Sequence, residues 1–555
     1  MTVSFWLEDA EDGIRRPTLD GSCTVDVAVV GAGLTGLWTA REVLRRDPTR
    51  SVLVLEARTA GFGASGRNGA WLIAGLGISP GELARRTSPE QARATILAMR
   101  GALDEVEHTL AEDGIDARLR RAGNLRVARG PHEVPAMEHS LEVLERLGVA
   151  EGYELLDADA LARRVHVADA RGALFEPYSA AIHPGHLVRG LARSVEAHGG
   201  RIVEHTPVVD LTPRRGRARP TVVTPTGTVS ADAVVLATEA WTSRLPGFER
   251  RVLPVYSLVV LTEPIDDERW AQIGWQGHEL LASHRYTVDY LSRTVDGRIL
   301  FGGRGAPYHF GSRIADRYDH HERTHAGLRQ QLLEWFPALR GVGFSHAWGG
   351  PLGMPRDWMP SFEHDPATGI GAAYGYTGQG VLATNLAGRV LADLVVHGDT
   401  PYRDLPLVGH RPRRWEPEPL RWLGARYLQV ALARQAHHGQ IGHPVNAHHL
   451  AIQLAAVRQG HLHAVHLVHH MGVGEDQAGA AIEHHARALA PLAAAAGGVA
   501  EQIAQQGIEQ HRVEGLAGDA ALDVDAHHRR GHGAGGGGHE AVGSCAAGLS
   551  GGGGS

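Results

Sequence analysis

The feature that most constrains the fold is an apolar segment followed by closely spaced glycines, V-D-V-A-V-V-G-A-G-L-T-G over residues 25–36. Gly31, Gly33 and Gly36 have the spacing G-x-G-x-x-G. In a βαβ unit the first glycine permits a tight turn, the second lets the backbone approach a pyrophosphate, and the third lets the helix pack closely on the sheet. The segment therefore predicts a Rossmann unit, with a strand over 25–30 and a helix over 34–46.

A second predicted strand, 51–56, ends on Glu56, twenty residues after Gly36. An acid at this place binds the ribose hydroxyls of a dinucleotide, and it disfavours a cofactor with a 2′-phosphate such as NADP. The helix start adds backbone N–H groups and a positive dipole end for the phosphates. The predicted dinucleotide contacts in this unit are Gly31, Gly33, Leu34, Thr35, Gly36, Glu56, Ala57 and Arg58.

The residues after Glu56 are A-R-T-A-G-F-G-A-S-G-R-N-G-A. This stretch resembles the loop that lies against the flavin in FAD-dependent oxidoreductases of the glycine/D-amino-acid oxidase (DAO-type) family. Glycines suit such a loop, because a backbone on a flat ring system leaves no room for Cβ atoms. An ordinary surface turn is the alternative. The resemblance implies that FAD is the cofactor, with contacts from Ser65, Gly66, Arg67, Asn68 and Gly69.

Four further blocks resemble the same family, at residues 183–208, 234–241, 348–360 and 375–381. In the first block, the resemblance implies that Val208 touches the adenine side of FAD through its backbone. In the last block, Gly378, Gln379 and Gly380 stand at the start of a predicted helix. The positive end of that helix would face the flavin, although every helix start carries such a dipole.

The resemblance covers about residues 25–433, and segments 301–308 and 414–424 look closest to the γ-glutamylputrescine oxidase-like branch. It implies an α/β (α+β) fold in which a Rossmann-type FAD-binding domain is interleaved with a β-rich substrate-binding domain. We expect FAD-binding parts at about 22–80, 183–245 and 345–400, and substrate-binding parts at about 81–182 and 246–344. Residue patterns also predict a helix over 82–113 that breaks near Ser88, and strands over 201–211, 221–230 and 233–237.

The resemblance implies that the C–N bond of an amine or amino acid is oxidised by hydride transfer to the flavin, giving an imine that hydrolyses. Arg304 is a candidate fork for a substrate carboxylate, with a surface ion pair as the alternative. Tyr286, Tyr290, Tyr376 and Trp348 are candidates for the pocket wall, with packing as the alternative. Arg304, Tyr286 and Tyr376 are the candidate catalytic residues. His183 is expected to be structural rather than a base.

Two other functions stay open: a flavin-dependent dehydrogenase of a hydroxy acid, and a flavin-binding protein without catalysis. A tRNA-modifying flavoprotein is disfavoured by a net charge of −7 and the lack of a basic stripe, so no nucleic-acid partner is expected. The expected partner is a small amine or amino acid. The oligomeric state stays open.

Several absences narrow the chemistry further. We call residues 63–69 the flavin loop. The cysteines, Cys23 and Cys545, lie outside it, and Arg67-Asn68-Gly69 has no histidine, so FAD is expected to be held without a covalent bond. There is no lysine, so every mechanism that needs one is excluded. The acidic N-terminus lacks a signal-peptide pattern and no apolar run is long enough to span a membrane, which predicts a cytoplasmic protein.

Residues 434–555 form a His/Gly/Ala-rich low-complexity tail without any Phe, Trp or Tyr. Aromatic side chains dominate core energetics, so this stretch is not expected to build a core of its own. Translation of an incorrect reading frame, a disordered appendage and metal binding by the histidines are the alternatives. Because no carboxylate or cysteine pattern accompanies the histidines, no metal site is predicted.

Overall fold

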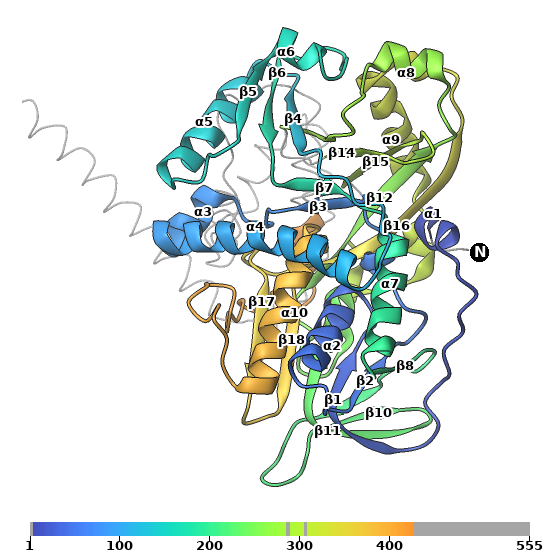
Figure 1. Cartoon of the computed structure of the whole chain (residues 1–555), viewed down its shortest axis with the longest axis vertical. Coiled ribbons are helices and arrows are strands. Elements are labelled where there is room, and N and C mark those ends of the chain that lie inside the picture. Colours follow the sequence, from blue (N-terminus) through green and yellow to red (C-terminus); the bar gives the residue numbers. More distant parts are fainter. Residues whose placement is uncertain (1–3, 285–288, 305–307, 427–555) are drawn as a thin grey trace, which may run out of the picture. The chain divides into compact units, whose positions relative to one another are not determined.

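The computed structural model describes residues 4–284, 289–304 and 308–426, except for the side chain of Arg304. The tail predicted from residue 434 lies outside the described residues. Within them the chain forms two eight-stranded sheets, a two-stranded sheet and the helices that pack on them (Figure 1). We name the two large sheets after the ligands that the family resemblance implies for them. The sheet that contains residues 23–30 is called the nucleotide sheet, and the sheet that contains residues 344–354 is called the substrate sheet.

The nucleotide sheet has the strand order β17-β18-β11-β1-β2-β8, and β10 and β9 extend it beside β11. Strand β1 pairs in parallel with β2 on one side and with β11 on the other. Its Val27, Ala28 and Val29 have no exposed surface, which explains the near-continuous apolar run in the sequence. The strands are β1 (Cys23–Val30), β2 (Val52–Leu55), β8 (Arg201–Val203), β9 (Asp210–Thr212), β10 (Thr221–Thr224), β11 (Gly227–Leu236), β17 (Ser361–Asp365) and β18 (Ile370–Tyr374).

Three helices pack side by side next to this sheet: α2 (Leu34–Arg46), α7 (Pro184–Ala197) and α10 (Gly380–His397) (Figure 1). Helix α2 packs against both of the others. Its Trp38 is fully buried, and a Cβ atom added at Gly388 of α10 would lie 2.6 Å from the Trp38 Cβ. This close approach fixes α2, and with it the glycine turn at its start, against α10.

The substrate sheet has the order β16-β12-β15-β14-β13-β4-β6-β5. Helix α9 (Glu322–Trp335) packs on β12 and β15, and the aromatic side chains of Trp275, Trp335, Phe301 and Phe336 fill the core beneath it. The strands are β4 (Asn124–Ala128), β5 (Glu154–Asp157), β6 (Gly172–Glu176), β12 (Leu253–Thr262), β13 (Leu280–Ser283), β14 (Asp289–Arg293), β15 (Ile299–Arg304) and β16 (Phe344–Met354).

The remaining elements connect or flank these layers. Strands β3 and β7 form the two-stranded sheet. The elements are α1 (Phe5–Asp9), α3 (Pro80–Arg86), α4 (Pro89–Glu112), α5 (Glu133–Arg146), α6 (Ala158–Ala162), α8 (Asp267–Ile273), β3 (Trp71–Ile73), β7 (Ser179–Ala181), η1 (Ala64–Gly66), η2 (Glu239–Arg244), η3 (Phe310–Ser312), η4 (Asp316–Asp319) and η5 (Pro337–Leu339).

The two large sheets confirm the predicted class, because the strands of each come from alternating parts of the chain. The helix break near Ser88 is confirmed as well: the Ser88 side chain caps α4 by accepting the backbone N–H of Gln91. Within the described residues, we find no helix with both the length and the apolar character needed to cross a membrane.

Two predicted strands are wrong in extent. The segment 201–211 is not one strand: β8 pairs in parallel with β2, whereas β9 pairs antiparallel with β10, and Pro207 lies between them. Proline cannot donate a ladder hydrogen bond, so it favours this interruption. The segment 221–230 is a hairpin that turns between Thr224 and Gly227, and its second strand, β11, runs on through the predicted strand 233–237 to Leu236.

Candidate active site

The glycine turn between β1 and α2 is built as the spacing predicts. Gly31 has a φ of +105°, and a Cβ atom added there would lie 2.6 Å from the carbonyl oxygen of Ala237. A Cβ atom at Gly36 would overlap the carbonyl oxygen of Gly31. Gly33 is the N-cap of α2. The three glycines therefore place no Cβ atom at the turn or at the helix start, which lets a pyrophosphate approach the backbone there.

Glu56 stands at the carboxyl end of β2 beside this turn. Its Oε2 accepts the backbone N–H of Ala32 over 2.8 Å, and its Oε1 accepts that of Arg58 over 2.9 Å. Burial raises the pKa of Glu56, while these N–H groups lower it. The carboxylate thus joins the glycine turn to the exposed Ala57 and Arg58. The backbone N–H of Thr206 donates to the Glu56 carbonyl over 2.8 Å and brings the segment with Val208 to the same edge.

The loop after β2 folds back onto the start of α2. Ser65, in η1, accepts the backbone N–H of Leu34 with its hydroxyl oxygen over 2.8 Å. A Cβ atom added at Gly33 would lie 2.9 Å from this oxygen. Ser65 and Gly33 therefore face each other across the helix start. The structure brings together the two segments that the sequence predicts to bind FAD.

The Arg67 side chain is buried and turned into the protein. Its Nε donates to the Phe62 carbonyl over 2.7 Å, and its Nη1 pairs with Asp319 and donates to the Gly349 carbonyl over 3.1 Å. The Trp348 indole donates to the Arg67 carbonyl over 2.9 Å. Arg67 and Trp348 thus fix the loop on the substrate sheet. Side-chain contact of Arg67 with FAD stays a prediction.

The N-terminal segment supports the loop from another side, and the sequence patterns did not reveal this. The hydroxyl of Ser4 donates to the Gly66 carbonyl over 2.6 Å, and the indole of Trp6 donates to the Asn68 carbonyl over 2.8 Å. The Asn68 amide in turn donates to the Ser65 carbonyl over 2.8 Å. The only sequence signal is the apolar group Phe-Trp-Leu within an acidic terminus.

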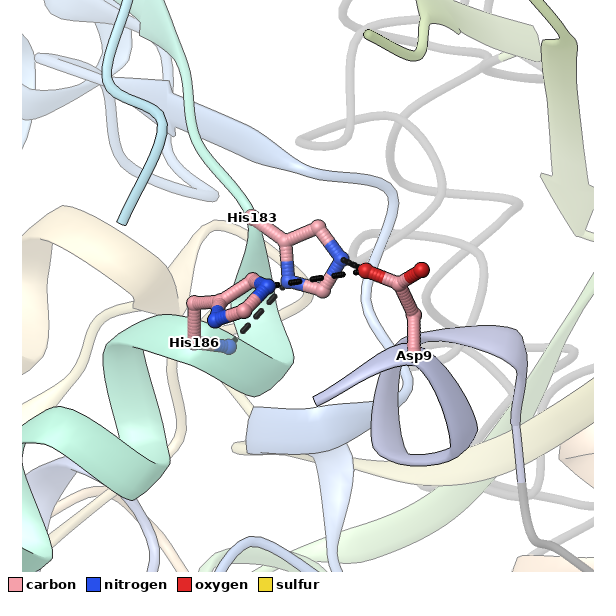
Figure 2. A group of neighbouring side chains, drawn as sticks. All are labelled: Asp9, His183 and His186. Carbon is pink, nitrogen blue, oxygen red and sulfur yellow. Dashed lines mark hydrogen bonds and ion pairs between the residues drawn. The ribbon is translucent and has the colours of Figure 1, made fainter. Parts of the chain in front are cut away.

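Helix α1 is anchored by a cluster of Asp9, His183 and His186 (Figure 2). Each residue has one side-chain N or O atom that could bind a metal ion, and these atoms lie within 4.8 Å of one another. Two observations oppose a metal ion there. Arg118 Nη1 lies 3.2 Å from the Asp9 Oδ2 that would be a ligand. His183 Nδ1 accepts the backbone N–H of His186 over 3.1 Å, so the proton of the neutral ring is on Nε2, the atom that faces Asp9. His183 therefore caps α7 and holds α1, which is a structural role.

The substrate sheet meets the flavin loop at Tyr290 of β14. A Cβ atom added at Gly69 of the loop, or at Gly302 of β15, would overlap the Tyr290 ring. The Tyr290 hydroxyl lies 3.2 Å from the Ser257 Oγ, and the Trp71 ring lies edge-on with its centroid 6.1 Å from that of Tyr290. Two glycines thus leave room for one aromatic ring between the loop and the sheet.

The other predicted pocket residues have different positions. The backbone of Arg304 pairs with Ser257, which brings it to the region of Tyr290, although its side chain is not described. Tyr286 lies outside the described residues. Tyr376 is buried, and its hydroxyl lies 2.9 Å from the Thr35 Oγ1 of α2.

The loop before α10 is packed tightly. Gly378 has a φ of +91°, Gln379 is the N-cap and α10 begins at Gly380, as predicted. A Cβ atom added at Gly77 would overlap the Thr377 hydroxyl. The loop therefore lies directly against the segment that follows the flavin loop. The N-terminus of α10, which is the positive end of the helix dipole, begins at this loop.

Comparison with known proteins was consistent with this geometry. The FAD dependent oxidoreductase (DAO) family model matches residues 26–394. Gamma-glutamylputrescine oxidoreductase of Escherichia coli is 31% identical over 439 residues, which are 77% of this chain and 98% of the relative. Glycine oxidase of Geobacillus kaustophilus is 26% identical, over 68% of this chain and 94% of the relative.

Solved structures share the fold. The crystal structure of that glycine oxidase superimposes with a TM-score of 0.58 at 23% identity, covering 70% of this chain and 99% of the other. L-proline dehydrogenase from P. horikoshii gives a TM-score of 0.57 at 20% identity, covering 70% and 98%. The family match and the relative that is 31% identical confirm the predicted cofactor, FAD, and the predicted enzyme class. The chain belongs to the DAO family of FAD-dependent oxidoreductases.

Proposed function

We propose that this flavoenzyme oxidises the C–N bond of a small amine or amino acid that carries a carboxylate. The observation that carries the proposal is the meeting of Gly69 in the flavin loop with Tyr290 in the substrate sheet. A substrate bound against this wall lies beside the segment that the family resemblance assigns to the flavin. The relatives named for γ-glutamylputrescine and glycine support an amine or amino acid as the substrate.

Tyr290, Ser257 and Arg304 form one end of the proposed pocket. The strand register places Tyr290 opposite Gly302 and Arg304 opposite Ser257, so these residues share one area of the sheet. A guanidinium there can bind a carboxylate through two parallel hydrogen bonds. We propose Arg304 as the carboxylate fork and Tyr290 as a wall residue. Tyr286, four residues before Tyr290, stays a candidate for the same wall.

The residues present fit FAD, because the glycine turn at the start of α2 and the Glu56 carboxylate offer what a pyrophosphate and a ribose require. When bound, FAD supplies the hydride acceptor for this oxidation. We propose that FAD is held by Gly31, Gly33, Leu34, Thr35, Gly36, Glu56, Ala57, Arg58, Ser65, Gly66, Arg67, Asn68, Gly69, Val208, Gly378, Gln379 and Gly380.

For Tyr376 we propose a different role from that of a pocket wall. Its hydroxyl is engaged with Thr35 and its ring is buried. We propose that it positions the start of α2 relative to α10. It would thereby hold the N-termini of α2 and α10 in fixed positions around the cofactor.

FAD is proposed to be held without a covalent bond. Cys23 opens β1 and so lies at the strand end opposite the glycine turn at Gly31. Acid or denaturant should therefore release all of the flavin. Anaerobic reduction of the bound flavin by amines tests the function itself: bleaching by a carboxylate-bearing amine supports the proposal, and bleaching by hydroxy acids alone contradicts it.

A further inference from the structure

Glu239 occupies an unusual position between the nucleotide sheet and the substrate sheet. It follows β11 and opens η2 with a φ of +43°, in the left-handed region that residues other than glycine rarely adopt. Such a conformation costs free energy and persists where the surroundings hold it in place. The contacts of its side chain show what holds it.

The carboxylate of Glu239 joins the ends of two other strands. Its Oε1 accepts the backbone N–H of Gly353, near the end of β16, over 3.1 Å. Its Oε2 accepts the backbone N–H of Gly375, directly after β18, over 3.1 Å. A Cβ atom added at Gly353 would lie 2.6 Å from Oε2, and Gly375 has a φ of +84°. Both glycines are therefore required for this arrangement.

The three segments that meet at this carboxylate are 234–241, 348–360 and 375–381. These are the blocks whose resemblance to the DAO family places them around the flavin. Helix α10 and its N-cap follow the last of them. Glu239 thus holds together three separate parts of the proposed cofactor site.

Among the side chains that the structure describes, none of opposite charge pairs with the Glu239 carboxylate. Its hydrogen-bond partners are backbone N–H groups. The titratable groups on the elements packed against it are Tyr256 of β12, His346 of β16, Tyr374 of β18, Arg244 of η2 and Tyr376. Burial raises the pKa of Glu239 to about 7, and the N–H groups of Gly375, Gly353 and Tyr376 oppose this rise. We therefore expect the carboxylate to change its charge near neutral pH.

We propose that Glu239 is a positioning residue of the flavin site: it draws the ends of β16 and β18 onto η2, and its negative charge lowers the midpoint potential of the bound flavin. A nearby negative charge disfavours the addition of electrons. The inference rests on the assignment of these segments to FAD and is independent of the substrate.

The test measures FAD dissociation constants and flavin midpoint potentials at pH 6 and pH 8. In Glu239→Gln, the FAD dissociation constant should rise about tenfold at pH 8, because one charge-assisted hydrogen bond is lost. The potential of the variant should be higher than that of the wild type at pH 8 and nearly equal to it at pH 6. Glu363→Gln is the matched control, because Glu363 is also a buried carboxylate of the nucleotide sheet and accepts the Tyr374 hydroxyl.

Equal potentials of the wild type and Glu239→Gln at pH 8 would overturn the charge effect, and an equal loss of FAD affinity at both pH values would leave only a structural role. The wild type supplies a second test that needs no variant. The absorption spectrum of its oxidised flavin should titrate with an inflection near pH 7. A spectrum that stays constant from pH 6 to pH 8 would contradict the proposal, whatever the folding of the variants.

Discussion

The hydroxyl oxygen of Ser65 accepts the backbone N–H of Leu34, the first residue of α2, over 2.8 Å. This bond ties the flavin loop to the helix start where the pyrophosphate of FAD is proposed to bind. In Ser65→Ala the N–H loses its partner, which costs about 1 kcal/mol. We therefore expect the FAD dissociation constant to rise about fivefold.

Fluorescence titration of the apoprotein with FAD measures this change. Ser140→Ala is the control, because Ser140 bonds to a backbone carbonyl within α5, far along the chain from the flavin loop. A Ser65→Ala variant that binds FAD as tightly as the control would show that the loop does not contact the cofactor through this serine.

The nucleotide-binding unit could be predicted from the sequence because its determinants are local. Gly31, Gly36 and Glu56 lie within one βαβ unit, where Gly36 packs on the backbone of Gly31 and Glu56 accepts the backbone N–H of Ala32. The roles of Trp6 and Glu239 could not be predicted, because their partners are distant in sequence. The split of 201–211 into β8 and β9 depends on pairing with different strands, which a single-segment pattern does not contain.

Acid should destabilise the protein partly through His183. Burial lowers the pKa of His183 to about 4, below its ordinary value of 6.5. Between pH 4 and pH 6.5 the unfolded chain therefore binds more protons than the folded protein. The stability that the neutral His183 contributes is present above pH 6.5 and is lost as the pH falls toward 4. His183→Asn keeps an N-cap acceptor for α7 but removes the titration.

Thermal unfolding at pH 4.5 and pH 7.5 tests this prediction. The decrease in Tm at the lower pH should be smaller in His183→Asn than in the wild type. His139→Asn is the control, because the His139 side chain is 67% exposed. Equal decreases in all three proteins would show that His183 does not contribute to the acid sensitivity.

Replacement of Arg304 should weaken the binding of substrates with a carboxylate more than that of substrates without one. If its guanidinium binds a carboxylate, Arg304→Gln loses a charge-assisted interaction of about 1.5–3 kcal/mol, and KM for amino acids should rise roughly 10- to 100-fold. KM for an amine without a carboxylate should change little. A parallel loss for both kinds of substrate would assign Arg304 to folding rather than to recognition.

Oxygen should reoxidise the reduced enzyme slowly. A fixed positive charge near the flavin stabilises the superoxide formed in this reaction, but the chain has no lysine, and Arg67 of the flavin loop is paired with Asp319. Stopped-flow mixing of the reduced enzyme with oxygenated buffer measures the rate. Asp319→Asn leaves Arg67 unneutralised and should react faster. A wild type that reoxidises much faster than free reduced FAD would contradict the prediction.

The most direct test of the proposed function is anaerobic titration of the purified flavoprotein with a matched panel of substrates. The panel contains amino acids of both configurations, ω-amino acids, polyamine conjugates that bear a carboxylate, and the corresponding hydroxy acids. We predict that a carboxylate-bearing amine bleaches the flavin absorbance and that its hydroxy analogue does not. Bleaching by a hydroxy acid alone, or by no member of the panel, would contradict oxidation of a C–N bond.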